Sequence, residues 1–296
     1  MKPQTKILVT GAKGQLGKKI IEMLSPNYAL VLTDSQEMDI TDQISVNKVI
    51  GEEQPDFIIH AAAYTRVDAA EENEEICRKV NALGTKNIAE AAKANDATVI
   101  YISTDYVFDG TKTTPYVETD IAKPLSVYGQ TKYEGEEFVR NICEKYFIIR
   151  TAWVFGELPE GHPGTNFVET MLRLAQEKDE LNIVGDQIGS PTYTGDLVDI
   201  IEQIIKYAAA KTQGADVPYG TYHFSGQNPA SWYDFAIEIF NQTNTTIKVN
   251  SITSDQYPQK AKRPTYSYLS KDKIEKAFKT NVRDWKEMLA EYLIKR

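Results

Sequence analysis

Short apolar runs alternate with segments of helical period along the first half of the chain. The apolar runs have strand length and are rich in Ile, Val and Leu; they lie at 6–10, 28–34, 56–64, 97–108 and 145–156. Helices are expected between them, at 16–25, 45–54, 71–95 and 126–139, the third being one long helix or two with a break near Gly84. This alternation predicts an α/β fold, a Rossmann-type doubly wound parallel sheet with helices on both faces.

The alternation ends near residue 156. A Gly- and Pro-rich segment at 156–167 predicts a loop or lid, and 220–226 is typical of a further sheet strand. We expect a large sheet domain and a smaller, discontinuous substrate domain towards the C-terminus. The sheet domain would comprise 1–155 with 190–226 returning to it, and the smaller domain 156–189 and 227–296. In such sheets ligands bind beyond the carboxyl ends of the strands.

Composition and charge narrow the class of protein. The chain has 296 residues, 42% of them hydrophobic and 25% charged, which is typical of a globular protein. A formal net charge of −9 argues against nucleic acid or anionic membrane as a partner. The two cysteines, Cys77 and Cys143, lack metal-ligand spacing. The sequence shows neither a signal peptide nor an apolar run of transmembrane length, so we expect a cytoplasmic protein.

A glycine-rich turn follows the first expected strand. Gly11, Gly14 and Gly17 form a G-x-x-G-x-x-G pattern between that strand and a helix. Glycines let backbone N–H groups approach a pyrophosphate, and the helix N-terminus adds a partial positive charge. The pattern predicts a dinucleotide site, the alternative being an ordinary strand-to-helix loop.

Asp34 ends the second expected strand, where a carboxylate can accept hydrogen bonds from an adenosine ribose. The alternative is a turn-forming aspartate. The same carboxylate would repel a 2′-phosphate unless a cation such as Lys13 lies close. The residues therefore leave both NADH and NADPH open.

Tyr128 and Lys132 are four residues apart on the expected helix 126–139, so they share one helix face. Thr104 lies at the end of the preceding strand, which faces the same crevice. A free tyrosine has a pKa of about 10, and a lysine ammonium nearby favours the phenolate. We expect Tyr128 to donate a proton to a ketone oxygen while Thr104 stabilises the developing alkoxide. Alone, Y-x-x-x-K would also suit a half-exposed tyrosine beside a solvated lysine.

Five segments together resemble one family of the extended short-chain dehydrogenase/reductase superfamily. They are "STDYVFDG" (103–110), "YGQTKYEGE" (128–136), "IIRTAWVFG" (148–156), "NFVETMLRLA" (166–175) and "VGDQIGSPTYTGDL" (184–197). They look like the dTDP-4-dehydrorhamnose reductase family. The resemblance implies reduction of the C4 ketone of dTDP-4-dehydro-L-rhamnose (dTDP-4-dehydro-6-deoxy-L-mannose), with NADPH or NADH, to dTDP-L-rhamnose for cell-surface polysaccharides.

The resemblance also assigns residues. Tyr128 would be the proton donor and Lys132 its ribose-binding partner. Further cofactor contacts would come from the phosphate turn, the adenine side and the segment "AAAYT": Gln15, Leu16, Asp39, Ile40, Ala63, Tyr64 and Thr65. Substrate contacts would come from Thr104, Asp105, Trp153, Asn166 and Arg263. A guanidinium such as that of Arg263 suits a diphosphate.

One departure from the family concerns metal. Some relatives hold Mg²⁺ with carboxylates at a dimer face, but this chain has Lys18 and Lys19 where one such acid is expected. Two cations cannot ligate Mg²⁺. We therefore expect no metal site, and a monomer or weak homodimer.

Three alternatives stay open. A sugar-nucleotide 4,6-dehydratase commonly uses an Asp-Glu pair after the strand-end threonine, whereas here Asp105 is followed by Tyr106. An epimerase shares the tyrosine and lysine and holds its NAD tightly. A non-catalytic NADP-binding regulatory subunit, a class that also resembles this family, would retain the same residues without turnover.

Overall fold

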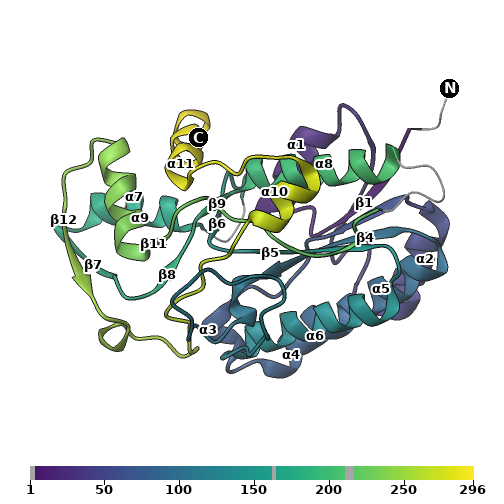
Figure 1. Ribbon diagram of the computed structural model, residues 1–296, viewed down its shortest axis with the longest axis horizontal. Coiled ribbons are helices and arrows are strands. Elements are labelled where there is room, and N and C mark those ends of the chain that lie inside the picture. Colours follow the sequence, from purple (N-terminus) through teal and green to yellow (C-terminus); the bar gives the residue numbers. More distant parts are fainter. Residues whose placement is uncertain (1–3, 162–164, 211–216) are drawn as a thin grey trace.

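A six-stranded parallel sheet forms the centre of the protein (Figure 1). The computed structural model describes residues 4–161, 165–210 and 217–296. The strand order is β10-β5-β4-β3-β1-β2. The strands are β1 (Lys6–Thr10), β2 (Ala29–Thr33), β3 (Phe57–His60), β4 (Thr98–Thr104), β5 (Tyr146–Thr151) and β10 (Gly220–His223). The α/β class and the parallel sheet expected from the sequence are confirmed.

Helices cover both faces of this sheet, and the side chains of β1 point alternately into the two hydrophobic cores between the sheet and these helices. Ile7 and Val9 pack into a cluster with α1 (Gln15–Leu24) and α8 (Thr194–Ala210). Leu8 packs into a second cluster with α2 (Gln43–Glu53), α5 (Thr85–Ala94) and α6 (Val127–Ile142). Figure 1 shows α1, α8 and α10 (Asp272–Phe278) on one side of the sheet and α2, α5 and α6 on the other.

The remaining elements lie mostly beyond one end of the sheet (Figure 1). Three two-stranded pairs occur there: β6 (Val154–Phe155) with β9 (Thr192–Tyr193), β7 (Glu180–Val184) with β12 (Lys248–Ile252), and β8 (Ile188–Gly189) with β11 (Ala230–Ser231). They are accompanied by α7 (Phe167–Glu177), α9 (Trp232–Gln242) and α11 (Trp285–Lys295). Part of the expected lid, 162–164, lies outside the described residues.

Two expected elements differ in detail. The expected strand 145–156 is divided into β5 and β6, because Trp153 has a φ of 49° and turns the chain out of the sheet. The expected helix 71–95 begins with α4 (Glu74–Arg78), continues through a π-helical turn (Lys79–Gly84) and ends with α5. A π turn adds a residue to a helix and is frequent at functional sites. Short helices also occur at α3 (Val67–Ala70), at the 3₁₀ turn Asp105–Val107 and at Ser254–Gln256.

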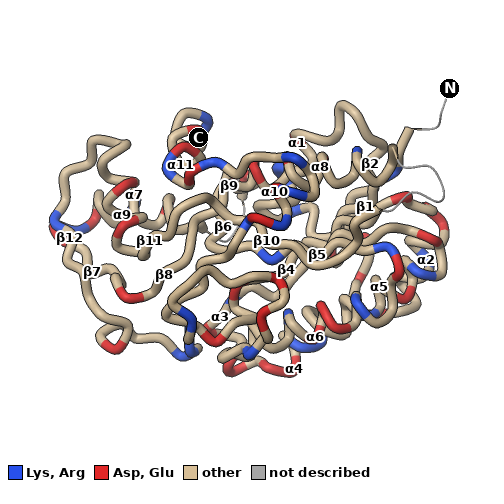
Figure 2. The backbone as a smooth tube through the Cα atoms, viewed as in Figure 1, with Lys and Arg blue, Asp and Glu red and all other residues tan. Residues whose placement is uncertain are grey.

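Charges of both signs are distributed along the whole backbone. Figure 2 shows Lys and Arg interspersed with Asp and Glu over the helices and loops. The net charge of −9 is therefore not concentrated in one segment. Within the described ranges, none of the helices combines the length and apolar character needed to cross a membrane.

Candidate active site

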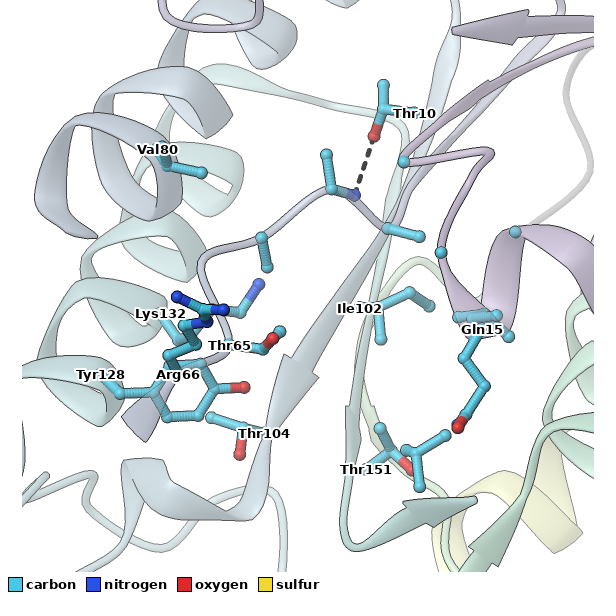
Figure 3. A pocket seen from close by; sticks show the side chains of 18 of the residues that line it. Thr10, Gln15, Thr65, Arg66, Val80, Ile102, Thr104, Tyr128, Lys132 and Thr151 are labelled. Atoms are coloured by element: carbon cyan, nitrogen blue, oxygen red, sulfur yellow. Dashed lines mark hydrogen bonds between the residues drawn. The ribbon is translucent and has the colours of Figure 1, made fainter. Parts of the chain in front are cut away.

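A cleft of about 1040 Å³ opens at the carboxyl ends of the central strands. The loops after β1, β2, β3 and β4 line it, together with the start of α6. Trp153, Asn166 and Trp232 border it from the smaller part of the molecule. Figure 3 shows Tyr128, Lys132, Thr65 and Thr104 on one side of this cleft and Gln15 on the other.

The glycine turn is shaped by close backbone contacts. Gly11 has a φ of +69°, which favours glycine, and its carbonyl accepts a hydrogen bond from Gly14 N at 3.0 Å. Gly14 caps α1 without a side-chain hydrogen bond, so the first N–H groups of the helix face the cleft. Gln15 and Leu16 follow at the cleft wall. This arrangement suits an anion such as a pyrophosphate.

Gly17 is expected to be essential for this turn. A Cβ there would lie 2.4 Å from Gly11 O and 2.5 Å from Ala12 O, and both are backbone atoms that cannot move without opening the turn. Gly17→Ala should lower the melting temperature and weaken NAD(P)H binding by about five- to 150-fold, because overpacking costs about 1–3 kcal/mol. Gly51→Ala is the control, since nothing lies within 4 Å of its Cβ. Equal cofactor affinity of Gly17→Ala and wild type would contradict this account.

The adenosine end of the cleft is acidic. Asp34 Oδ2 accepts a hydrogen bond from Lys13 N at 3.2 Å, and the Lys13 ammonium pairs with Glu37 at 3.2 Å. The ammonium of Lys13, the expected partner of a 2′-phosphate, is thus already paired with the Glu37 carboxylate. The residues expected near the adenine, Asp39 and Ile40, also line the cleft.

Tyr128 lies in the first turn of α6, whose N-cap Ser126 accepts a hydrogen bond from Gly129 N at 3.2 Å. Gly129 is required there because a Cβ would lie 2.3 Å from Tyr106 O. The helix therefore begins directly against the backbone that follows β4. This packing places Tyr128 and Thr104 near each other at the wall of the cleft (Figure 3).

The pKa of Tyr128 differs from the sequence-based expectation. Burial raises the pKa of Tyr128 above its ordinary value, the nearby Thr104 hydroxyl acts in the opposite direction, and the Asp105 carboxylate raises it further. The expected lowering by Lys132 was wrong for this structure, because burial is the larger effect. A raised pKa keeps the phenol protonated, which is the form that a proton donor needs.

Lys132 is buried one turn beyond Tyr128. Its ammonium lies 4.0 Å from the centre of the Tyr101 ring. Burial lowers the pKa of Lys132 to about 7, and the nearby Glu136 carboxylate opposes this change. Near neutral pH, the charges around Lys132 therefore decide whether its ammonium keeps its proton.

Asp105 connects the cleft to the C-terminal segment. Its Oδ1 accepts a hydrogen bond from Thr104 at 3.1 Å and its Oδ2 accepts one from Ser267 at 2.5 Å. Burial raises the pKa of Asp105 to about 6. Asp105 lines the cleft, but each of its carboxylate oxygens already accepts a hydrogen bond from a neighbouring hydroxyl.

The three remaining substrate candidates lie in different places. Trp153 stacks on Trp232 with ring centres 3.6 Å apart, and Asn166 caps α7 while donating to Gly156 O at 2.8 Å. Both line the cleft. Arg263 does not: its guanidinium binds Asp68 at 2.6 Å and borders a neighbouring pocket of about 800 Å³.

Comparisons with known proteins agree with this geometry. A family model described as the RmlD substrate binding domain matches residues 5–296. The dTDP-4-dehydrorhamnose reductase of Aggregatibacter actinomycetemcomitans is 44% identical to this chain, covering 96% of it and 97% of the relative. The chain belongs to the dTDP-4-dehydrorhamnose reductase family.

Two further relatives extend the comparison. The structure of dTDP-4-dehydrorhamnose reductase from Bacillus anthracis in complex with NADP superposes with a TM-score of 0.92, at 38% identity, covering 99% of this chain and all of that one (100%). Spore coat polysaccharide biosynthesis protein SpsK of Bacillus subtilis is 41% identical and covers 99% of this chain and 98% of its own. Like its family, the protein is an NAD(P)H-dependent oxidoreductase with a Rossmann-type sheet.

Two residues that were not predicted from the sequence are placed by the structure in or behind the cleft. Asn81, in the π-helical turn, accepts a hydrogen bond from Tyr64 N at 2.7 Å and donates to Tyr64 O at 3.1 Å and to Thr131 Oγ1 at 3.2 Å. It thereby ties the "AAAYT" loop to α6, and Ala63 and Thr65 rather than Tyr64 line the cleft. The second, Arg66, lines the cleft as well and has no ion pair among the described residues.

Lys18 and Lys19, which stand where a Mg²⁺-binding acid was expected, contact the loop that follows β6. Lys19 is only 2% exposed and pairs with Glu22 at 2.9 Å and Glu157 at 3.0 Å. Lys18 donates to Leu158 O at 2.7 Å. Across 4–161, 165–210 and 217–296, no group of three or more His, Cys, Asp or Glu residues could hold a metal ion.

Proposed function

We propose that this protein reduces the C4 ketone of dTDP-4-dehydro-L-rhamnose to dTDP-L-rhamnose, using NADPH or NADH. The observation that carries the proposal is that Tyr128, Thr104 and Lys132, which lies one helical turn beyond Tyr128, line the same cleft as the glycine turn. This is the arrangement that a ketone reductase needs around the reacting carbonyl.

The proposed roles follow from the positions in the cleft. Bound NAD(P)H supplies the hydride. Tyr128 donates its proton to the ketone oxygen, and Thr104 stabilises the negative charge that develops on that oxygen. Lys132 binds the nicotinamide ribose and stabilises the phenolate left behind. The glycine turn, with Gln15 and Leu16, holds the diphosphate of the cofactor.

The sugar nucleotide would lie on the other side of the reacting centre. Asp105, Trp153 and Asn166 line this part of the cleft and would contact the sugar. Arg263 keeps its proposed role at the diphosphate only if its pair with Asp68 opens. Arg66 is the better-placed cation, because it already lines the cleft without an acidic partner among the described residues.

The likeness to SpsK, named for spore coat polysaccharide biosynthesis, supports a role in making a donor for cell-surface polysaccharide. We place this role in the cytoplasm and assign it to a monomer or weak homodimer. Sedimentation velocity over a range of concentrations tests the oligomeric part.

The direct test is incubation with dTDP-4-dehydro-L-rhamnose and either NADPH or NADH. Oxidation of the nicotinamide, followed by its absorbance, together with dTDP-L-rhamnose identified by chromatography and NMR, is the expected result. Formation of a different sugar, or release of no oxidised cofactor while the sugar is epimerised, would overturn the assignment.

The dehydratase alternative gives a separate prediction. Elimination of water needs a second acid beside Asp105, and Tyr106 stands there with burial and the Asp105 charge raising the pKa of its phenol. We expect no 4-keto-6-deoxy sugar from dTDP-glucose above background. Its formation at rates matching those of the reduction would contradict the reductase proposal.

Asp34 is expected to control the choice of cofactor. The ribose 2′-hydroxyl of NADH can donate to its carboxylate, whereas the 2′-phosphate of NADPH is repelled by it and by Glu37. Asp34→Ala should therefore weaken NADH binding by about three- to tenfold, the worth of about one hydrogen bond, and leave NADPH unchanged or tighter. The two dissociation constants are measured on the same variant, so the NADPH value is the control for the NADH value. An equal loss for both cofactors would remove Asp34 from the ribose site.

A further inference from the structure

Four residues of α6 form a ladder that begins at the proposed proton donor. Tyr128, Lys132, Glu136 and Arg140 are each four residues apart, so they follow one face of the helix. Glu136 is fully buried, at 0% exposure, and Lys132 is 2% exposed. A carboxylate thus lies one turn behind Lys132 in the protein interior.

The sheet beneath the ladder presents a polar row to Glu136. Ser103 on β4, Arg150 on β5 and His223 on β10 are neighbours in the parallel register. Glu136 Oε1 accepts hydrogen bonds from Ser103 Oγ at 2.5 Å and Arg150 Nε at 2.9 Å. Its Oε2 accepts from Arg150 Nη2 at 2.7 Å and Arg140 Nη1 at 3.1 Å.

His223 completes this row as a neutral side chain. Its Nδ1 donates to Tyr116 O at 3.1 Å, which leaves Nε2 to accept from Arg150 Nη1 at 3.4 Å. Burial and Arg150 lower the pKa of His223 well below its ordinary value. Arg150 of this row and Arg140 of α6 therefore hold Glu136 ionised with two guanidinium groups.

Among the described residues, the titratable groups near Lys132 lie on α6, β4, β3 and α4. They are the Tyr128 phenol and Glu136 carboxylate on α6, the Tyr101 ring on β4, His60 on β3 and the Cys77 thiol on α4. Burial raises the pKa of the Cys77 thiol and lowers that of His60, so both are neutral. Of these described groups, Glu136 is the one that carries a negative charge.

We propose that Glu136 is a positioning residue for Lys132: held ionised by Arg150, Arg140 and Ser103, its carboxylate keeps the buried ammonium charged and directed towards the cofactor. This inference rests on the proposed function of Lys132 at the ribose and phenol. Without Glu136, the guanidinium of Arg150 would be an uncompensated positive charge near a second buried cation. The ammonium of Lys132 would then lose its proton at a lower pH.

The test is the pH dependence of Glu136→Gln. If Lys132 must be charged, activity and cofactor affinity fall as pH rises through its pKa. Loss of the carboxylate lowers that pKa, so the pH at which activity falls and the pH at which cofactor affinity falls (the two alkaline limbs) should both decrease by about one unit. At a pH above both pKa values, this shift is a tenfold loss of activity and of affinity relative to wild type. Cofactor affinity is measured by fluorescence titration and needs no sugar, so it tests this inference even if the sugar assigned above is wrong.

Glu137→Gln is the matched control. Glu137 is the next residue on the same helix, and within the described part of the chain its one ion pair is with Arg140, at 2.6 Å, so both limbs should stay at their wild-type pH. Should Glu136→Gln not fold, the double variant Glu136→Leu with Arg150→Met replaces the ion pair by apolar groups, a change that buried pairs often tolerate. Its limbs should also move to lower pH, but by less than in Glu136→Gln, because the Arg150 charge is removed together with the carboxylate while Arg140 remains. Wild-type limbs in whichever of these variants folds would overturn the inference.

Discussion

Tyr128→Phe is expected to lower turnover by about 10²–10⁴, the usual worth of a positioned acid. The change removes one hydroxyl and keeps the ring, which packs edge-on against Tyr106 with ring centres 5.9 Å apart. Thr104 keeps its bond to Asp105, so the cleft wall should be preserved. Cofactor affinity should change little, because the phenol contributes at most one hydrogen bond of about 0.5–1.5 kcal/mol to the ribose.

Single-turnover reduction paired with cofactor titration measures both effects. Tyr133→Phe is the control, because Tyr133 lies on the same helix but packs against the cluster of Phe108 and Tyr116, away from the cleft. It should reduce the sugar at nearly the wild-type rate. If Tyr128→Phe does so as well, another group is the proton donor and the proposed mechanism fails.

The parts of the structure that the sequence predicted well are those governed by local patterns. Ile7, Leu8 and Val9 in the middle of β1 are all apolar because both faces of the strand are buried, and such a continuous apolar run is typical of a central parallel strand. The Tyr128–Lys132 pair was predictable because a spacing of four residues places two side chains on one helix face. The glycine turn was predictable because it needs glycine at fixed positions, for reasons that the Gly17 contacts show.

The parts that it did not predict depend on contacts between distant segments. β5 ends where Trp153 adopts a positive φ, and the ring of Trp153 stacks there on Trp232. Nothing in "TAWVFG" predicts that turn. Asn81 acts through Tyr64 and Thr131, which lie in two other segments. Arg263 lies outside the cleft because Asp68, almost 200 residues earlier, binds its guanidinium.

The same limit applies to charge. From the spacing alone, Lys132 should lower the pKa of Tyr128, because opposite charges attract. The structure adds burial, which acts on both groups and raises the pKa of the phenol while lowering that of the ammonium. Both shifts favour neutral forms, so the charge of Lys132 has to be supported by Glu136 from behind and by bound cofactor from the front.

Lys132→Met should therefore behave differently from Tyr128→Phe. Methionine keeps an apolar side chain of similar length against the Tyr101 ring, and the buried charge is removed rather than left unpaired, so the fold should persist. A hydrogen bond from a charged group is worth about 1.5–3 kcal/mol, so cofactor affinity should fall by about ten- to a hundredfold. Turnover should fall by about 10² or more as well, because the phenolate formed on proton transfer loses its stabilising charge.

The same two measurements separate the variants: loss of turnover alone assigns proton donation to Tyr128, and loss of both assigns ribose binding and charge stabilisation to Lys132. Wild-type cofactor affinity in Lys132→Met would show that the ammonium does not contact the ribose.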